Sequence, residues 1–110
     1  MQNTRAKFFV SMAFSAMAVI IVSAPIIEAQ AATSEEIKNI VVEEANAIGI
    51  PPALALAVAK VESNFDDDAK SSAGAIGVMQ IMPRTAMGEY GVHREELFSP
   101  RVNVQVGVDY

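Results

Sequence analysis

The feature that most constrains the fold is an almost wholly apolar run that begins at residue 52 and ends in a single carboxylate, Glu62. A helix that is apolar nearly all round is usually buried, so we expect residues 52–63 to form a buried helix with Glu62 at least partly enclosed. Burying a carboxylate is costly unless it is paired or protonated, so enclosure would favour the protonated form. The alternative is a surface glutamate in the last helical turn, paired with Lys60 or Lys70.

The composition restricts the class of protein and the kind of partner. A length of 110 residues is enough for one domain, and the 52% of hydrophobic residues argues against disorder. The net charge of -5 and the lack of a basic patch argue against nucleic acid as a partner. Because the chain has no cysteine, it has neither a disulfide scaffold nor a thiolate metal site.

The first 31 residues have the pattern of a signal peptide. A short positive segment is followed by the apolar run 8–22, which only two serines interrupt. The Ala-Gln-Ala sequence at 29–31 has the small-x-small pattern that signal peptidase recognises, so we place cleavage after Ala31. An uncleaved membrane anchor is the alternative, but the run is shorter than the roughly 20 residues that a spanning helix needs. In either case we expect residues 32–110 to be exported to the periplasm or cell envelope.

Helix start and stop signals predict further helices. Thr33 followed by Glu36 three residues later is a capping box that starts an amphipathic helix, and Gly49 is placed to end it. A second, shorter helix is expected over residues 83–90. The only histidine, His93, lies among charged residues, and we interpret it as a surface residue rather than a ligand.

The middle of the chain is polar and then rich in small residues. The three aspartates at 66–68 suggest calcium, but the alternating acids, central glycine and later glutamate of an EF-hand are missing, so a solvated turn is favoured. Gly74 and Gly77 can adopt positive φ or let a ligand approach the backbone. Gln80 is an amide among apolar neighbours and needs hydrogen-bond partners. It either faces a ligand in a cleft or is a core amide satisfied by the backbone.

The last residues carry two conflicting signals. Ser99 followed by Pro100 has the pattern of an N-cap with proline in the first turn, which predicts a helix. Valines at alternate positions from 102 to 108 have the period of two that is typical of a strand. The pattern alone leaves both interpretations open.

Five short motifs follow one another between residues 50 and 110. They are E-S-x-F at 62–65, S-x-x-G-A-x-G-V-M-Q at 71–80, I-M-P-x-T-A at 81–86, L-F-x-P at 97–100 and N-V-x-x-G-x-x-Y at 103–110. In this order and spacing the chain resembles the soluble lytic transglycosylases, which have a mainly α, lysozyme-like fold and cleave bacterial peptidoglycan. The resemblance implies a helix over the last motif, no cofactor and no metal. It implies peptidoglycan glycan strands as the partner.

The resemblance also implies a role for each matched residue. Glu62 would be the sole catalytic acid/base, which protonates the glycosidic oxygen between N-acetylmuramic acid and N-acetylglucosamine. It would then take a proton from the C6 hydroxyl of the muramic sugar and so close a 1,6-anhydro ring. Ser71 would lie near the glutamate and the substrate N-acetyl group. Gly77 would let the sugar approach the backbone, and Met79 and Gln80 would line the glycan site.

One departure from the family concerns the end of the sequence. The family normally continues with more helix and an A-Y-N-A-G motif whose tyrosine lines the site, whereas this sequence stops at Tyr110. We therefore expect residues 32–110 to be the N-terminal portion of a C-terminally truncated transglycosylase domain. An inactive or glycan-binding remnant and a hydrolytic muramidase are the alternatives. Association with a secretion or conjugation apparatus that opens the wall locally is a further expectation, which no motif supports.

Overall fold

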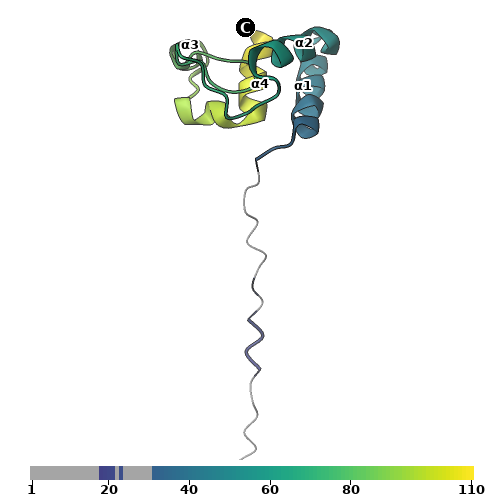
Figure 1. Ribbon diagram of the computed structural model, residues 1–110, viewed down its shortest axis with the longest axis vertical. Helices are drawn as coiled ribbons and strands as arrows, with labels where there is room; N and C mark the ends of the chain where they lie inside the picture. Colours follow the sequence, from purple (N-terminus) through teal and green to yellow (C-terminus); the bar gives the residue numbers. More distant parts are fainter. Residues whose placement is uncertain (1–17, 22, 24–30) are drawn as a thin grey trace, which may run out of the picture.

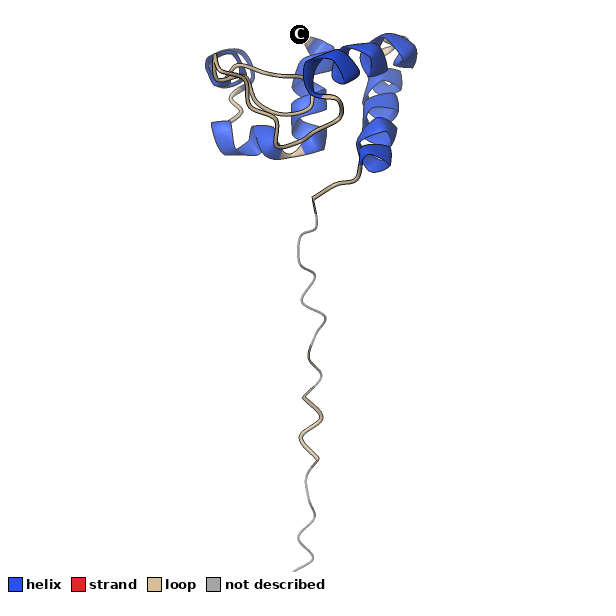
Figure 2. Cartoon of the chain, viewed as in Figure 1, coloured by secondary structure: helices blue, strands red, loops and turns tan. Residues whose placement is uncertain are grey.

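The protein is mainly helical. The computed structural model describes residues 18–21, 23 and 31–110. These residues form the helices α1 (Ser34–Ile48), α2 (Pro52–Ser63), α3 (Pro83–Tyr90), η1 (Arg94–Phe98) and α4 (Pro100–Asp109), of which η1 is a 3-10 helix. The same residues contain no strand, only isolated bridges from Ile76 to Lys70 and to Ile81. The prediction of a mainly α fold is therefore confirmed (Figure 2).

The predicted signal peptide falls almost wholly on residues outside the described part. Its boundary after Ala31 therefore stays a prediction. From residue 31 the description is continuous to Tyr110. Within the described segments 18–21, 23 and 31–110, no helix is both long enough and apolar enough to cross a membrane.

Helix α1 forms as the sequence predicts. The Thr33 hydroxyl accepts a hydrogen bond from the Glu36 N–H (3.2 Å), and the Glu36 carboxylate accepts one from the Thr33 N–H (2.7 Å), which completes the capping box. Gly49 ends the helix with φ of 79°, in the left-handed region that favours glycine. The buried side of the helix consists of Ile37, Val41 and Ala45.

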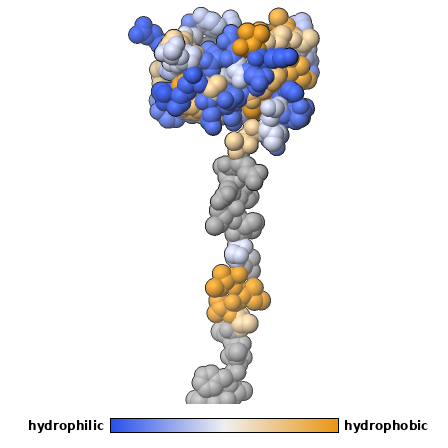
Figure 3. Space-filling view, in the orientation of Figure 1, coloured by the Kyte–Doolittle hydropathy of each residue, from blue (hydrophilic) through white to orange (hydrophobic). Residues whose placement is uncertain are grey.

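Helix α2 has the predicted boundaries but not the predicted burial. Its buried side chains are Ala55 and Ala59, whereas Leu54, Val58 and Val61 are 59%, 40% and 84% exposed. The helix packs on α1 and buries only these small residues. Figure 3 shows hydrophobic side chains gathered at this end of the domain. The expectation of a buried helix is wrong because an apolar composition does not ensure that a neighbouring element covers the helix.

Helix α4 lies at the centre of the domain, between α1 and the side formed by α3 and η1 (Figure 1). The Ser99 hydroxyl accepts a backbone hydrogen bond in the first turn, and Pro100 follows it, as the cap signals predict. Because neighbours cover α4 on more than one side, Val104, Val106 and Val108 are all buried. The alternating valines therefore belong to a surrounded helix, and the strand interpretation is wrong.

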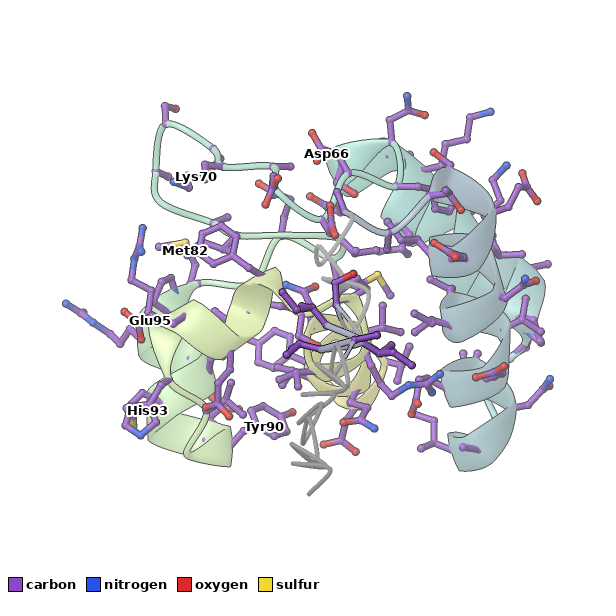
Figure 4. The ribbon with its side chains drawn as sticks, turned by 90° about the horizontal axis from the view of Figure 1, so that it is seen from below. Asp66, Lys70, Met82, Tyr90, His93 and Glu95 are labelled. Atoms are coloured by element: carbon purple, nitrogen blue, oxygen red, sulfur yellow. The ribbon has the colours of Figure 1, made fainter. Side chains whose placement is uncertain are left out.

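Helices α3 and η1 form the side of the domain farthest from α1 (Figure 1). Pro83 begins α3, and Gly91 ends it with φ of 65°. The His93 N–H then donates to the Glu96 carboxylate (2.8 Å) at the start of η1. His93 is exposed and, in Figure 4, lies with Glu95 at the edge of the molecule away from α1. The interpretation of His93 as a surface residue is confirmed.

The connection between α2 and α3 contains a tight turn at residues 76–81. Ile76 and Ile81 exchange both of their backbone N–H···O hydrogen bonds, each 3.0 Å long, and both side chains are buried. The four residues between them reverse the chain, and Gly77 and Gln80 adopt positive φ of 78° and 53°. This 76–81 turn carries three of the predicted site residues into the interior between α2 and α4.

Candidate active site

Glu62 lies in the last turn of α2 and is exposed. It follows Val58 by one turn, so the two side chains lie on the same side of the helix. The expectation of partial enclosure is wrong, and the alternative of a surface glutamate in the last helical turn is the one that the structure shows. No ion pair of the described residues joins Glu62 to Lys60 or Lys70.

A groove runs between α2 and α4. It consists of two adjoining hollows of about 240 and 120 Å³, which share Val58, Met79 and Gly107. The larger hollow is also lined by Gln80, Ile81, Met82, Thr85 and Tyr110, and the smaller by Ile50, Leu54, Ala55 and Val108. We call these two hollows the α2–α4 groove. Glu62 lines neither hollow; it lies one helical turn after Val58, which lines both.

A separate hollow of about 300 Å³ lies on another side of α4, where Tyr90, Gln105 and Asp109 contribute to its lining. None of the predicted site residues lines it. Burial, and then a hydrogen bond from the Tyr90 hydroxyl to the Asp109 carboxylate, raise the pKa of Tyr90. We place the candidate site in the α2–α4 groove because two of the predicted site residues, Met79 and Gln80, line it, and Glu62 lies one turn after its residue Val58.

Met79 and Gly107 meet at the floor of the groove. Met79 is buried, and its side chain lies so close to Gly107 that a Cβ added there would be 2.6 Å from both Cβ and Cγ of Met79. Only glycine allows this approach between α4 and the 76–81 turn. The expectation that Met79 occupies a cleft agrees with its place in the lining, and its contact with a glycan stays a prediction.

Gln80 also lines the groove, but its amide is engaged by the backbone. Its Nε2 donates to the carbonyl oxygens of Ala69 (3.2 Å) and Gly77 (3.0 Å). Its backbone has φ of 53°, an unusual value for a residue other than glycine. Of the two interpretations for Gln80, that of an amide satisfied by the backbone agrees with both hydrogen bonds of Nε2. Gln80 thereby holds the 76–81 turn to the preceding loop.

Gly77 and Ser71 lie differently from the expected arrangement. Gly77 is buried, and a Cβ on it would collide with the Asn103 amide and would lie 2.6 Å from the Leu97 carbonyl oxygen. The groups that lie close to the Gly77 backbone are therefore Asn103 and Leu97 of the protein itself. The expected approach of a sugar to Gly77 stays a prediction. Ser71 is exposed and is not part of the groove lining; its Oγ accepts a hydrogen bond from the Ala75 N–H (3.0 Å) within a small turn.

Two further residues support the site, and the sequence reasoning assigned no role to either. Asn103 is fully buried and makes three hydrogen bonds, to the Met79 N–H and to the carbonyls of Ile76 and Leu97. The Ser63 hydroxyl, next to Glu62, donates to the Val78 carbonyl (2.7 Å). A signal for both was present, since each is a polar residue at a fixed place in one of the motifs.

The three aspartates after α2 form a turn rather than a metal site. Within residues 18–21, 23 and 31–110, no group of three or more His, Cys, Asp or Glu side chains is arranged to hold a metal ion. The Asp66 carboxylate accepts a hydrogen bond from the Asp68 N–H (2.9 Å), which stabilises the turn. Partial burial, and then repulsion by Asp68 and Asp66, raise the pKa of Asp67.

The chain matches known proteins over most of the described region. The model of the transglycosylase SLT domain matches residues 39–110. Membrane-bound lytic murein transglycosylase C of Actinobacillus pleuropneumoniae serotype 5b is 39% identical over 70 residues, which cover 56% of this chain and 19% of that protein. Soluble lytic murein transglycosylase of Escherichia coli K12 is 36% identical over 73 residues, which cover 56% of this chain and 10% of that protein. The chain thus spans only a small part of these relatives.

A solved structure is similar as well. It is the X-ray structure of an inactive glutamate-to-glutamine mutant of lytic transglycosylase Slt from Pseudomonas aeruginosa, with 32% identity and a TM-score of 0.58. The similarity covers 64% of this chain and 12% of that one. The lysozyme-like transglycosylase fold expected from the motifs is confirmed. The chain therefore belongs to the transglycosylase SLT domain family.

Proposed function

We propose that this domain is a peptidoglycan lytic transglycosylase. It cleaves the β-1,4 bond between N-acetylmuramic acid and N-acetylglucosamine and forms 1,6-anhydromuramic acid. The observation that carries the proposal is the match of the SLT domain over residues 39–110, within which Glu62 lies in the last turn of α2, one turn after the groove residue Val58. The names of the relatives and the inactive glutamate-to-glutamine mutant of the similar Slt structure support it.

One carboxyl group can carry the whole reaction. Protonated Glu62 gives its proton to the glycosidic oxygen, the bond from C1 to that oxygen breaks, and N-acetylglucosamine leaves with a hydroxyl group. The Glu62 carboxylate then takes the proton of the C6 hydroxyl as that oxygen bonds to C1. Atoms and charges balance without water, metal or cofactor, and Glu62 ends protonated, ready for the next cycle.

A bound glycan would supply the enclosure that Glu62 lacks in the free chain. The row of Leu54, Val58 and Val61 is exposed beside it, and apolar surface of this kind suits the faces of sugar rings. A strand lying along the groove would remove water from around the carboxyl group, and removal of water favours its neutral, proton-donating form. We therefore expect substrate binding and formation of the acid to be coupled.

We assign the remaining predicted residues to two kinds of role. Met79 and Gln80 would contact the glycan, because both line the groove. Gly77 would act indirectly, by allowing the 76–81 turn to pack on Asn103. Ser71 would contribute its hydroxyl near the substrate N-acetyl group from the adjoining loop.

The openness of the site favours a second candidate, a glycan-binding domain without catalysis. Glu62 is exposed, and no acidic residue of the described part of the chain lines the α2–α4 groove. Binding would then need the groove but not the carboxyl group. A hydrolytic muramidase is a further alternative, in which water takes the place of the C6 hydroxyl at the exposed carboxylate.

The test is to incubate the full chain with purified peptidoglycan sacculi and to identify the released muropeptides by mass spectrometry. We expect anhydro-muropeptides from the wild type and a loss of about 10²–10⁴-fold in Glu62→Gln, the range typical of general acid–base catalysis. Glu95→Gln, which changes an exposed glutamate of η1 that does not line the groove, is the matched control and should keep full activity. Products heavier by one water would indicate a muramidase. Binding to sacculi without products, equal in wild type and Glu62→Gln, would indicate the binding domain.

We infer further that residues 1–31 are a cleaved leader and that residues 32–110 act in the periplasm or cell envelope, where peptidoglycan is accessible. Opening of the wall for a secretion or conjugation apparatus would be one use of such an activity. The Ala-Gln-Ala sequence before Ala32 supports the leader. N-terminal sequencing of the protein from the envelope fraction should begin at Ala32, and an intact N-terminus in the membrane fraction would favour an anchor.

A further inference from the structure

Side chains from two different helices bind the same peptide group. The Ser63 hydroxyl donates to the Val78 carbonyl oxygen (2.7 Å), and the Met79 N–H donates to Asn103 Oδ1 (2.7 Å). The Val78 carbonyl and the Met79 N–H belong to one planar peptide unit. Ser63 belongs to α2 and Asn103 to α4, so this unit is held from both helices at once. We call Ser63, the Val78–Met79 peptide unit and Asn103 the peptide clamp.

On the α2 side, the Ser63 hydroxyl is fully engaged. It has a single proton, and two carbonyl oxygens are within reach, those of Val78 (2.7 Å) and Ala59 (3.2 Å). The shorter distance favours Val78 as the acceptor. The hydroxyl oxygen also accepts a hydrogen bond from the Asp66 N–H (3.3 Å), just after α2 ends. Ser63 thus connects the end of α2, the aspartate turn and the 76–81 turn.

On the α4 side, the orientation of the Asn103 amide is fixed by its partners. Its Nδ2 donates to the carbonyl oxygens of Ile76 (2.8 Å) and Leu97 (2.9 Å) while its Oδ1 accepts from Met79. A flipped amide would place its NH2 group against the Met79 N–H, so only one orientation satisfies every group. The side chain is fully buried and fills the space beside Gly77. The clamp is therefore rigid at this end.

The clamp lies directly between Glu62 and the floor of the groove. Ser63 is the next residue after Glu62, and Met79 forms the floor. Asn64 ends α2 in the left-handed conformation that asparagine commonly adopts, with φ of 52°. Phe65 follows with φ of 60°, a value that is rare for a bulky residue and persists only where the surroundings enforce it. The end of α2 is thus held in one geometry by the contacts of Ser63 that follow Glu62.

We propose that Ser63 is a positioning residue for Glu62: through the Val78–Met79 peptide unit and Asn103, it fixes the last turn of α2 against the floor of the α2–α4 groove. This inference rests on the proposed function. Ser63 does not touch the glycan in this proposal. The two hydrogen bonds share one peptide unit and polarise each other in the same direction, so weakening one end weakens the other.

Kinetics of Ser63→Ala in the full chain test the proposal. Displacement of a reacting group by about 1 Å can cost about 10²-fold in rate, so we expect kcat to fall roughly 10- to 100-fold. The KM should change less than about twofold, because the lining of the groove stays in place. Ser63→Thr keeps a hydroxyl at the same position and should restore most of kcat.

The matched control is Val41→Ala, which removes buried methyl groups from α1 and lowers stability without touching the clamp. Both variants are assayed at a temperature where circular dichroism shows that they are folded. An unchanged kcat in Ser63→Ala, or a loss in Val41→Ala as large as that in Ser63→Ala, would overturn the proposal.

A second measurement tests the clamp without relying on activity. In NMR spectra of the full chain, Ser63→Ala should shift the side-chain NH2 signals of Asn103 and accelerate hydrogen exchange of the Met79 amide. Asn103→Asp should in turn shift the backbone amides of Glu62 and Ser63, and neither variant should shift Gly88 in α3. The absence of transmitted shifts in both directions would overturn the clamp whatever the activity. A wild-type chain that shows these shifts but releases no products would overturn the proposed function and leave the clamp in place.

Discussion

Helices α1 and α2 pack against each other, yet the burial of their large apolar side chains is opposite. In α1 the large residues Ile37 and Val41 are buried, and Glu35, Glu36 and Glu43 are exposed. The sequence of α2 is more apolar, but Leu54 and Val61 are mostly exposed and only alanines are buried. The more hydrophobic helix is therefore the less buried one, and it is the helix that carries Glu62.

The difference extends to how each helix meets α4. On the α1 side, Arg101 of α4 forms ion pairs with Glu43 (2.8 Å) and Glu44 (2.5 Å), and Gln105 bonds to Glu44 as well. These contacts accompany extensive packing between α1 and α4. On the α2 side, the same central helix leaves the α2–α4 groove. The hollow of about 300 Å³ also lies on the α1 side, where Glu44 and Ile48 contribute to its lining. The two sides of α4 therefore differ in their ion pairs, which join α4 to α1 and not to α2.

Closing the groove is the change with the largest expected effect. In Gly107→Ala, the new Cβ would lie 2.6 Å from the Cβ and Cγ of Met79, near the rigid base of that side chain. Overpacking of this kind typically costs 1–3 kcal/mol, and we expect about 3 kcal/mol because neither backbone can yield easily. Urea unfolding followed by circular dichroism measures the loss.

Gly88→Ala is the matched control for this prediction. Gly88 lies in α3 with open space around its Cα, so alanine should stabilise that helix by about 0.5–1 kcal/mol. If both glycine substitutions changed the free energy of unfolding alike, the close approach of Met79 to Gly107 would not be what makes glycine necessary there.

A pair of identical substitutions compares the two helices directly. Val41→Ala in α1 removes fully buried methyl groups and should cost about 2 kcal/mol through lost burial and a residual cavity. Val61→Ala in α2 removes methyl groups that are 84% exposed. It should change stability by less than about 0.5 kcal/mol, with a slight gain from the higher helix propensity of alanine. Equal losses would show that a partner in solution covers α2.

These elements also show what the sequence could predict. The boundaries of the helices followed from local signals, such as the capping box at Thr33 and the proline after Ser99, because capping is a short-range interaction between neighbouring residues. The exposure of α2 could not be predicted in this way. Whether an apolar face is covered depends on elements that are distant in the sequence, and the residue pattern of α2 contains no information about them.

The candidate site was predictable only in part, because the motifs are local and the contacts between them are not. Met79 and Gln80 line the groove, and Glu62 lies on α2 one turn after the groove residue Val58; their roles in catalysis and glycan binding stay predictions. The role of Gly77 was misjudged, because the neighbour that requires a glycine there is Asn103, 26 positions further along the chain. Hydrogen bonds between remote residues, such as that of Asn103 with Met79, become visible only in the folded structure.

The smallest predicted effect concerns the electrostatics of the two helices. α1 begins with Glu35 and Glu36, which the positive end of the helix dipole favours, whereas α2 ends beside three aspartates near its negative end. Partial burial, and then Asp68 and Asp66, raise the pKa of Asp67 in the folded protein above its ordinary value of 3.8. The protonated form of Asp67 is therefore favoured by folding, and the ionised form is disfavoured.

The sign of the pH dependence follows from this shift. The contribution of Asp67 to stability is fully present below pH 3.8 and is lost as the pH rises through the raised value in the folded state. Asp67→Asn should therefore be more stable than the wild type at pH 7, and the difference should vanish as the pH falls below about 4. Because Asp67 is only partly buried and water screens its neighbours, the gain should be only a few tenths of a kcal/mol, on the order of 0.3. Thermal unfolding at pH 3, 5 and 7 measures this gain in stability, with Glu95→Gln as an exposed control that should show no such trend.

A gain in Asp67→Asn that grew toward low pH would mean that Asp67 is stabilised as the carboxylate. The electrostatic contrast between the ends of α1 and α2 would then not hold.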